Sequence, residues 1–312
     1  MATAHKRNGL VELFRFFCSV WVAYFHGFFP ILSDKFNGGD VSVDFFFIVT
    51  GFFFLQSIEA YRKKRFFEGV RFLLLSKTKK ILITLIIAAL SILYCNIAFE
   101  LDFGGFNWPL SFLWFFVAQF VYTTIFYLLY KIIKKCSTFN IVCIVIICLS
   151  MCFFRLGIKQ LDIPGRGPAM IAFGILISQL PKIKIRAKNT MKARRWSLAI
   201  NIIGFIISAS AFACLAYFPR YDIWQLHLSC CVVCPALLYF ATALPVHSKI
   251  LNFLGEFSVF IYLGQCPILL HHYYVSKDTR DQFPWLCVCA VALFIINRIV
   301  NAIIRRRKLA RV

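Results

Sequence analysis

The chain has 312 residues, of which 61% are hydrophobic, and it carries 35 lysines and arginines against 13 aspartates and glutamates. A soluble domain is closer to half apolar, so the composition excludes an ordinary soluble protein and indicates an integral membrane protein. The basic excess alone would also suit nucleic-acid binding. Its residues, however, lie in short clusters between apolar runs, which is typical of membrane topology, and we expect no nucleic-acid partner.

Ten apolar segments follow one another along the chain, and we expect each to be a transmembrane helix in an all-α, multi-pass protein. The sixth is short and has Gly165, Gly167 and Pro168 at its start, so we expect it to be broken or tilted. With no stretch suited to a soluble domain, residues 1–312 are predicted to form a single membrane domain. The predicted segments are residues 10–30, 41–59, 79–99, 108–131, 139–157, 167–181, 197–218, 223–245, 253–274 and 283–304.

The distribution of basic residues predicts the orientation of these helices. If the N-terminus is cytoplasmic, 26 of the 35 lysines and arginines fall in cytoplasmic segments and 7, including Arg166, fall in outer ones. Arg15 and Arg298 lie within helices. This asymmetry follows the positive-inside rule, and it predicts that both termini are cytoplasmic.

The cysteines lie almost all within apolar segments. Cys231 and Cys234 have the CxxC spacing, but no second pair accompanies them. We expect small apolar packing residues and neither a metal site nor disulfides.

The first segment carries an arginine and a histidine, which are costly at membrane depth. Arg15 and His26 are eleven positions apart, so their levels on a helix differ by about 16 Å. The predicted orientation places Arg15 near the cytoplasmic end and His26 near the outer end. In one interpretation Arg15 points to the cytoplasm beside Glu12, on the same helix face, and His26 faces lipid headgroups. In the other, the two residues are functional.

The second segment contains the stretch GGDVSVDFFFIVTGFFF, with Asp44 among phenylalanines near its outer end. Consecutive helices joined by a short loop pack as a hairpin, which would bring Asp44 close to His26. A carboxylate beside an imidazole orients the ring and raises its basicity, which suits a general base. The alternative is that Asp44 caps the second helix, where a negative charge is favoured.

Three lysines, including Lys77 and Lys80, precede the third segment on the predicted cytoplasmic side. They are either ordinary positive-inside charge or a site for a donor that carries phosphate groups.

Together these motifs resemble the start of the acyltransferase-3 family of integral membrane acyltransferases. The resemblance rests on Arg15-x10-His26 followed by the GG and DFFF stretch, and it continues in family order to about residue 275. Lys77 and Lys80 stand in place of the family's basic RxxR pair. Residues 166–177 are similar to its F-x-x-G helix, and residues 251–270 are similar to its late LG-x-x-S-x-x-IYL helix.

The resemblance implies transfer of an acyl group, most plausibly acetyl, from cytoplasmic acyl-CoA to a hydroxyl of a glycan or lipid-linked sugar outside the cytoplasmic (inner) membrane. It implies His26 as the essential base with Asp44 as its carboxylate, and Arg15, Lys77 and Lys80 as donor-binding groups. Acyl-CoA would be a co-substrate, with no bound cofactor and no metal. The acceptor sugar and the oligomeric state stay open.

The late helix departs from the family pattern at Gln265, where a histidine is expected, and glutamine cannot shuttle a proton. Glu12 and Gln265 are therefore assigned supporting roles. Asn8, Gln119 and Gln265 are all candidates for stabilising an oxyanion. Two alternatives remain: a transporter or flippase for a lipid-linked sugar, and an inactive relative that binds acyl-CoA.

Overall fold

Every element in the described part of the chain is a helix, as the sequence predicts. The computed structural model describes residues 8–25, 38–62, 66–71, 75, 86, 90, 107–133, 135–155, 162–182, 190–217, 223–274 and 282–309. Its main elements are α1 (Gly9–Ala23), α2 (Gly38–Phe52), α3 (Phe54–Arg62), α5 (Asn107–Ile132), α6 (Cys136–Arg155), α7 (Asp162–Gln179), α8 (Thr190–Tyr217), α9 (Ile223–Leu228), the π-helix η4 (Ser229–Val233), α10 (Cys234–Ala243), α11 (Lys249–Tyr274) and α12 (Gln282–Leu309).

Nine of the ten predicted segments coincide with these helices, and the third, residues 79–99, lies outside the described residues apart from positions 86 and 90. The sixth segment is not broken, because α7 is continuous from Asp162 and contains Pro168. Two of the described helices are by themselves long and apolar enough to cross a membrane, at Phe115–Ile132 and Met191–Tyr217. Ten crossings and cytoplasmic termini stay predictions.

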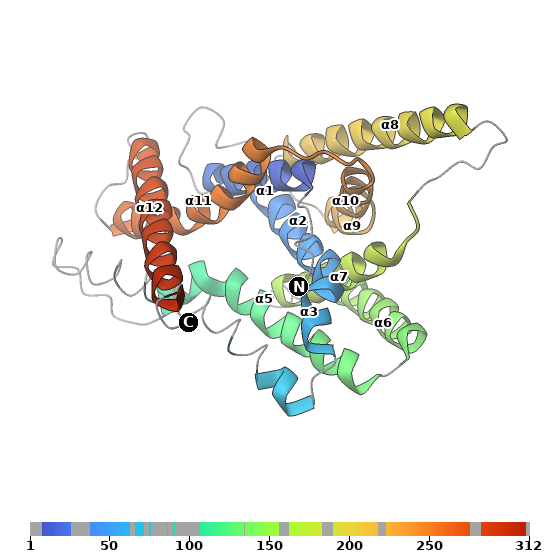
Figure 1. Cartoon of the computed structure of the whole chain (residues 1–312), viewed down its shortest axis with the longest axis horizontal. Coiled ribbons are helices and arrows are strands. Elements are labelled where there is room, and N and C mark those ends of the chain that lie inside the picture. Colours follow the sequence, from blue (N-terminus) through green and yellow to red (C-terminus); the bar gives the residue numbers. More distant parts are fainter. Residues whose placement is uncertain are drawn as a thin grey trace.

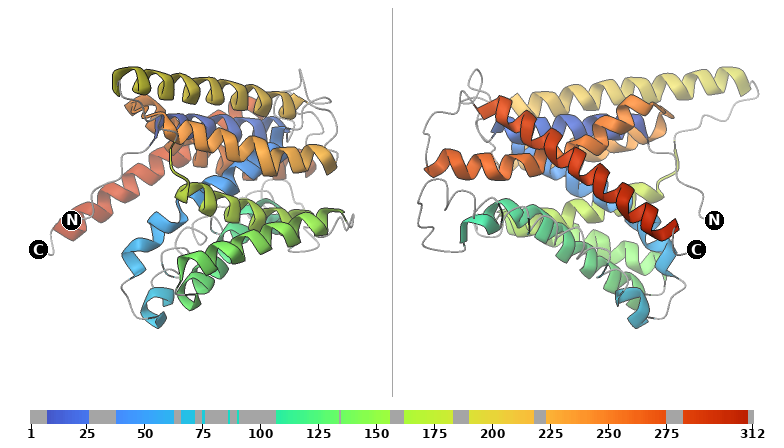
Figure 2. Two further views of the ribbon diagram at one scale, coloured as in Figure 1. Left: turned by 90° about the vertical axis from the view of Figure 1, so that its right-hand side faces the viewer. Right: turned by 60° about the vertical axis from the view of Figure 1, so that its left-hand side comes forward.

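Helix α2 lies at the centre of the arrangement. It contacts α1, α5, α7, α8 and α10, and Figure 1 shows it running from α1 toward α7. In the left-hand view of Figure 2, α2 passes between an upper group that contains α1, α8 and α10 and a lower group that contains α5, α6 and α7. A side chain on α2 can therefore face either group.

Two glycines let α2 and α7 pack with their backbones in contact. A Cβ atom at Gly51 would collide with the carbonyl oxygen of Ile171, and one at Gly174 would collide with that of Ile48. Small residues at helix crossings permit this close approach in membrane proteins. The contact fixes the register of the two helices. Fully buried side chains surround it, namely Phe45, Phe47, Ile48, Met170, Ile171 and Ile175.

The start of α1 is anchored to the end of α10 by Asn8. Its Oδ1 accepts hydrogen bonds from the backbone N–H groups of Leu10 and Val11, which caps the helix. Its Nδ2 donates to the carbonyls of Ala241 and Leu244 at 3.1 and 2.8 Å.

Helices α1 and α11 run in the same direction side by side. Gly9 packs against Leu251, and Gly255 packs so closely on Glu12 that a Cβ atom at position 255 would collide with the Glu12 carboxylate. The two contacts advance together along both helices, so the register of α11 on α1 is set.

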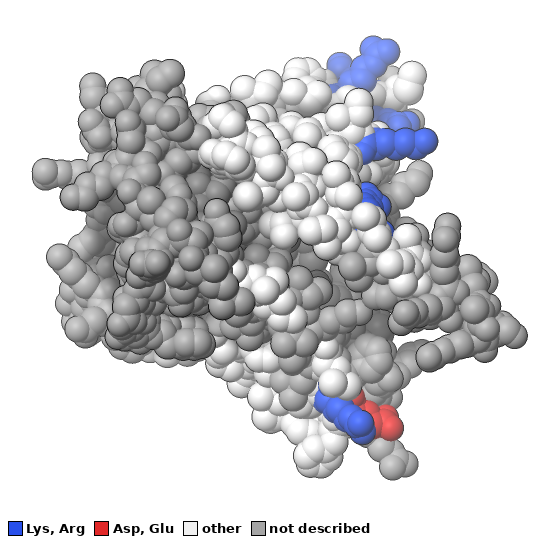
Figure 3. Space-filling model, turned by 90° about the vertical axis from the view of Figure 1, so that its left-hand side faces the viewer, with Lys and Arg blue, Asp and Glu red and all other residues white. Residues whose placement is uncertain are grey.

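The described surface shows how the charges are distributed. In the face drawn in Figure 3, most of the visible lysine and arginine side chains gather at the upper right, another basic side chain lies near the bottom beside an acidic one, and the described area between them carries no charged side chain. An uncharged face with cations at its margin suits contact with a bilayer.

Candidate functional site

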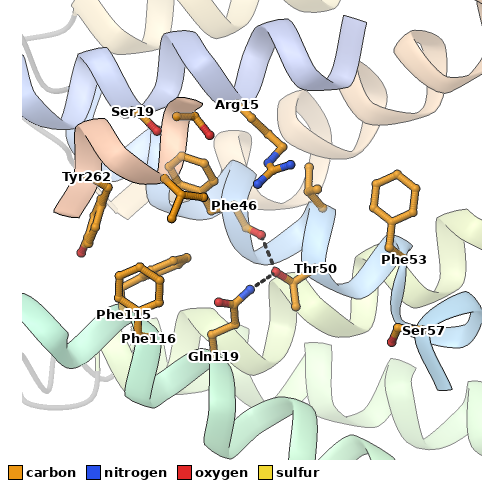
Figure 4. Close-up of a pocket in the computed structure, with 13 residues that line it drawn as sticks. Arg15, Ser19, Phe46, Thr50, Phe53, Ser57, Phe115, Phe116, Gln119 and Tyr262 are labelled. Atoms are coloured by element: carbon orange, nitrogen blue, oxygen red, sulfur yellow. Dashed lines mark hydrogen bonds between the residues drawn. The ribbon is translucent and has the colours of Figure 1, made fainter. Parts of the chain in front are cut away.

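A pocket of about 270 Å³ lies between α1, α2, α5 and α11. Figure 4 shows Arg15 reaching into it from α1 and Gln119 from α5. Its lining combines aromatic rings with small polar groups, which suits a ligand that has both apolar and hydrogen-bonding parts. The lining residues are Arg15, Ser19, Phe46, Val49, Thr50, Phe53, Ser57, Phe115, Phe116, Gln119, Ser258, Val259 and Tyr262.

The pocket is elongated along α2. Phe46 and Thr50 line it one turn apart, and Phe53, just past the end of α2, lines it close to a further turn on. The seven steps from Phe46 to Phe53 correspond to about 10 Å of helical rise, and the lining continues to Ser57 on α3. The shape therefore suits an extended ligand better than a compact one.

Arg15 is the one cation among the lining residues. Its Nη1 donates to Glu12 Oε2 at 2.8 Å, and its side chain is 26% exposed while that of Glu12 is 8% exposed. The predicted Glu12–Arg15 pairing is confirmed. The guanidinium nevertheless also faces the pocket (Figure 4), so pairing with Glu12 leaves part of it open to a ligand.

A hydrogen-bonded pair crosses the pocket between α2 and α5. Gln119 Nε2 donates to Thr50 Oγ1 at 2.5 Å, and Thr50 Oγ1 donates in turn to the carbonyl of Phe46 at 2.9 Å. Both bonds appear in Figure 4. The amide of Gln119 is thereby held in a defined orientation at the wall of the pocket.

Asp44 belongs to a separate, sealed cluster. It is fully buried, and its Oδ1 accepts from Arg166 Nε and Nη2 at 3.0 and 2.8 Å. Its Oδ2 accepts from Ser229 Oγ at 3.2 Å and from Cys230 Sγ at 3.4 Å. Asp44 is therefore not a helix cap, because α2 begins six residues earlier at Gly38. It joins α2 to α7 and to η4.

The sequence placed Arg166 in an outer segment between two helices, and its placement outside a helix is wrong. Arg166 lies near the start of α7 and is 7% exposed. Its Nη1 also donates to Asp40 Oδ1 at 3.1 Å, and its Nη2 donates to the Asp40 carbonyl at 3.0 Å. The guanidinium is thus paired with two acidic residues one turn apart on α2. The signal that could have revealed it is that pair of aspartates, since buried carboxylates require a cationic partner.

The predicted site residues fall into three groups. Arg15 lines the pocket and is paired with Glu12, whereas Glu12 itself and Asp44 are not among the lining residues. His26, Lys77 and Lys80 lie outside the described residues, so the contact of Asp44 with His26 and the lysine anion site stay predictions. Polar groups to which the sequence analysis assigned no role also line the pocket, among them Ser258 and Tyr262; they are the serine and tyrosine of the LG-x-x-S-x-x-IYL pattern, which was the available signal.

Gln265 is the remaining member of the predicted set. It lies on α11, is 2% exposed, and its Nε2 has no hydrogen-bond partner among the described residues. Such an atom is rare, because a buried donor without a partner costs free energy.

Comparison with known proteins gives one match. The family model described as an acyltransferase domain (Acyl_transf_3) covers residues 8–298. No curated protein and no solved structure matches the chain. The family match contains α1, the pocket and the Asp44 cluster, and it extends over most of the sequence. The chain therefore belongs to the acyltransferase-3 family and is a membrane acyltransferase.

Proposed function

We propose that the protein transfers an acyl group, most plausibly acetyl, from cytoplasmic acyl-CoA to a hydroxyl of a glycan or lipid-linked sugar on the outer side of the inner membrane. The observation that carries the proposal is the elongated pocket beside Arg15 in a chain of this family. A multi-pass topology with cytoplasmic termini, as the basic residues predict, would open the Arg15 end of the pocket toward the cytoplasm.

The lining of the pocket supports a pantetheine arm as its occupant. That arm is a narrow chain with amide and hydroxyl groups, and Gln119, Ser19 and Ser258 offer hydrogen-bonding groups between aromatic rings. Arg15 supplies positive charge at the wall. Lys77 and Lys80, which precede the third predicted segment, would hold the phosphates of the coenzyme.

In the proposed reaction His26 removes the proton of the acceptor hydroxyl, whose oxygen attacks the thioester carbon. The thiolate of coenzyme A leaves and takes up the proton. Asp44 would assist by holding the end of α2 in place through Arg166, Ser229 and Cys230, and by orienting the imidazole.

The test is transfer of label from acetyl-CoA to polymer or lipid-linked sugar by membranes that contain the protein. We expect His26→Ala to lower kcat by about 10²–10⁴-fold, the range for loss of a general base. Arg15→Ala should raise the KM for acyl-CoA more than it lowers kcat. A matched control is Lys249→Ala, which removes an exposed cation from the first residue of α11. Unchanged transfer by a normally inserted His26→Ala protein would refute the role of His26.

The transporter alternative depended on Arg15, Asp44 and Arg298 as buried polar groups along a transport path. Asp44 is already neutralised by Arg166. Arg298 is 52% exposed and pairs with Glu256 at 2.9 Å. Only Arg15 faces a pocket, which favours the acyltransferase proposal. Binding of acyl-CoA without any transfer would instead support the inactive relative that Gln265 suggests.

A further inference from the structure

Three amide side chains are candidates for stabilising the negative charge that develops on the thioester oxygen, and the structure separates them. Asn8, at the start of α1, donates through Nδ2 to two backbone carbonyls at the end of α10. Gln119 Nε2 donates to Thr50 Oγ1. Gln265 Nε2 has no partner among the described residues although the side chain is 2% exposed. Gln265 is therefore the candidate whose donor group is not already used by the fold.

The position of Gln265 relates it to the pocket. Ser258, which lines the pocket, is seven residues earlier on α11, so the two side chains share nearly one angular position and differ in level by about 10 Å. Tyr262, between them, also lines the pocket. A polar strip on α11 thus continues from the pocket to Gln265.

The register of α11 on α1 gives the level of Gln265. Gly255 packs against Glu12, and the two helices run in the same direction. Ten residues further along each helix lie Gln265 and Val22. Along the helix axis Gln265 is thus about 10 Å beyond the level of Ser258, toward the end of α1 where the sequence leads to the proposed base.

We propose that Gln265 Nε2 donates a hydrogen bond to the carbonyl oxygen of the acyl group during transfer. The inference depends on the proposed acyl-CoA chemistry. The acceptor oxygen forms a bond to the thioester carbon, and the π electrons of the C=O bond move to its oxygen, where the N–H group stabilises them. The carbonyl then re-forms as the C–S bond breaks, and the thiolate of coenzyme A leaves with the proton of the acceptor hydroxyl. An amide held without a partner needs no reorganisation to do this.

The decisive variant is Gln265→Met, which keeps the volume of the side chain and removes the donor. We expect kcat for transfer from labelled acetyl-CoA to fall about 100-fold, the effect of losing one such donor, with little change in KM. The thermal stability of the purified protein in detergent should stay the same or rise, because a buried unpartnered donor is removed. Gln265→His, which retains an N–H group, should keep more transfer than Gln265→Met.

The matched control is Asn201→Leu. Asn201 lies on α8, is buried, and has an Oδ1 without a partner among the described residues. Neither Asn201 nor Gln265 is itself a lining residue, but α11 contributes Ser258 and Tyr262 to the pocket whereas α8 contributes none. Replacement of Asn201 should leave transfer unchanged.

Two results would overturn the role of Gln265. One is a folded Gln265→Met protein that transfers at the parent rate. The other is a Gln265→Met protein that is less stable than the parent, together with a Gln265→His protein that transfers no faster than Gln265→Met. The amide would then have a structural role. Failure of the parent protein to transfer from acetyl-CoA would instead count against the proposed function itself, so the two failures are distinguishable.

Discussion

Two of the arginine–carboxylate pairs in the described part of the chain have the same separation and differ in their surroundings. In both Glu12–Arg15 and Asp44–Arg166 the shortest nitrogen–oxygen separation is 2.8 Å. Arg15 is 26% exposed, and Glu12 is its one hydrogen-bond partner among the described residues. Arg166 is 9% exposed in its side chain and reaches both Asp40 and Asp44.

The difference follows from what burial demands. A sealed ion pair loses hydration, and the attraction between its charges compensates only when further hydrogen bonds satisfy both groups. Asp44 accepts hydrogen bonds from four donor groups on Arg166, Ser229 and Cys230. In the Glu12–Arg15 pair the carboxylate is nearly buried, but the guanidinium is partly exposed at the pocket, so it can hold Glu12 and still reach a ligand. One arginine holds helices together, and the other is available for binding.

The largest test of this contrast is Arg166→Met. It leaves the carboxylate of Asp44 buried without its cation, so we expect the free energy of unfolding to fall by about 3–5 kcal/mol. Thermal unfolding in detergent, followed by the loss of monodisperse protein, would measure the change. Arg15→Met is the comparison and should cost less, about 1–3 kcal/mol, because it leaves the nearly buried Glu12 carboxylate without its partner but removes a cation that is itself partly exposed. Equal effects of the two substitutions would show that the pairs do not differ as their burial suggests.

A second test addresses the helix contact that seals the Asp44 cluster. In Gly174→Ala the new methyl group meets the carbonyl of Ile48 and the backbone of Phe52, which side-chain movement cannot relieve. We expect a loss of about 1–3 kcal/mol, the range for overpacking, in the same unfolding measurement.

The matched control is Gly264→Ala on α11, whose Cβ would come no closer than 3.1 Å to Ala290. It should cost clearly less. If Gly264→Ala were the more damaging change, close packing of α2 on α7 would not be what keeps the Asp44 cluster sealed.

The same contrast explains what the sequence could predict. The Glu12–Arg15 pair was predictable because residues three apart on a helix lie on one face, whatever the rest of the chain does. The helical segments were predictable because a helix pairs all the backbone polar groups of an apolar run that lies in a membrane.

The Asp44–Arg166 pair was not predictable in this way. Its members are 122 residues apart, and they meet only because Gly51 and Gly174 allow α2 to lie directly on α7. The positive-inside rule counts cations in the segments between helices, so it placed Arg166 outside the helices. It takes no account of a cation that lies within a helix and is neutralised by a carboxylate. The Gln119–Thr50 bond, which spans 69 residues, was missed for the same reason.

A third test concerns the pocket. Gln119→Met removes the hydrogen bond to Thr50 and keeps the volume of the side chain, so the free energy of unfolding should fall by about 1 kcal/mol. If the amide also contacts the donor, the KM for acetyl-CoA should rise several-fold. Thr124→Val on the same helix is the control, because the Thr124 hydroxyl bonds only to the carbonyl of Phe120. Equal KM values for both variants would remove Gln119 from the donor site.

The smallest expected effect lies just beyond α7, where Lys182 packs against the end of α2. Its Nζ lies 5.5 Å from the centre of the Phe52 ring and 4.8 Å from that of Tyr239, and it donates to Thr242 Oγ1 at 2.5 Å. Burial lowers the pKa of the Lys182 ammonium below the ordinary value for a lysine. This partly buried lysine thus differs from Arg15, which faces a pocket, and from the sealed Arg166.

The sign of the pH effect follows from which state binds the proton more tightly. Because the pKa of Lys182 is lower in the folded protein, the unfolded chain holds more protons between the folded pKa and 10.5, and the contribution of Lys182 to stability rises with pH across that window. Lys182→Met should remove this rise, whereas Lys249→Met, at an exposed position, should keep it. Unfolding temperatures of the three proteins from neutral to alkaline pH would measure it. If unfolding temperature changed with pH in the same way for the parent and for Lys182→Met, Lys182 would be as well solvated as a surface lysine. The buried region around Arg166 would then not extend to Lys182.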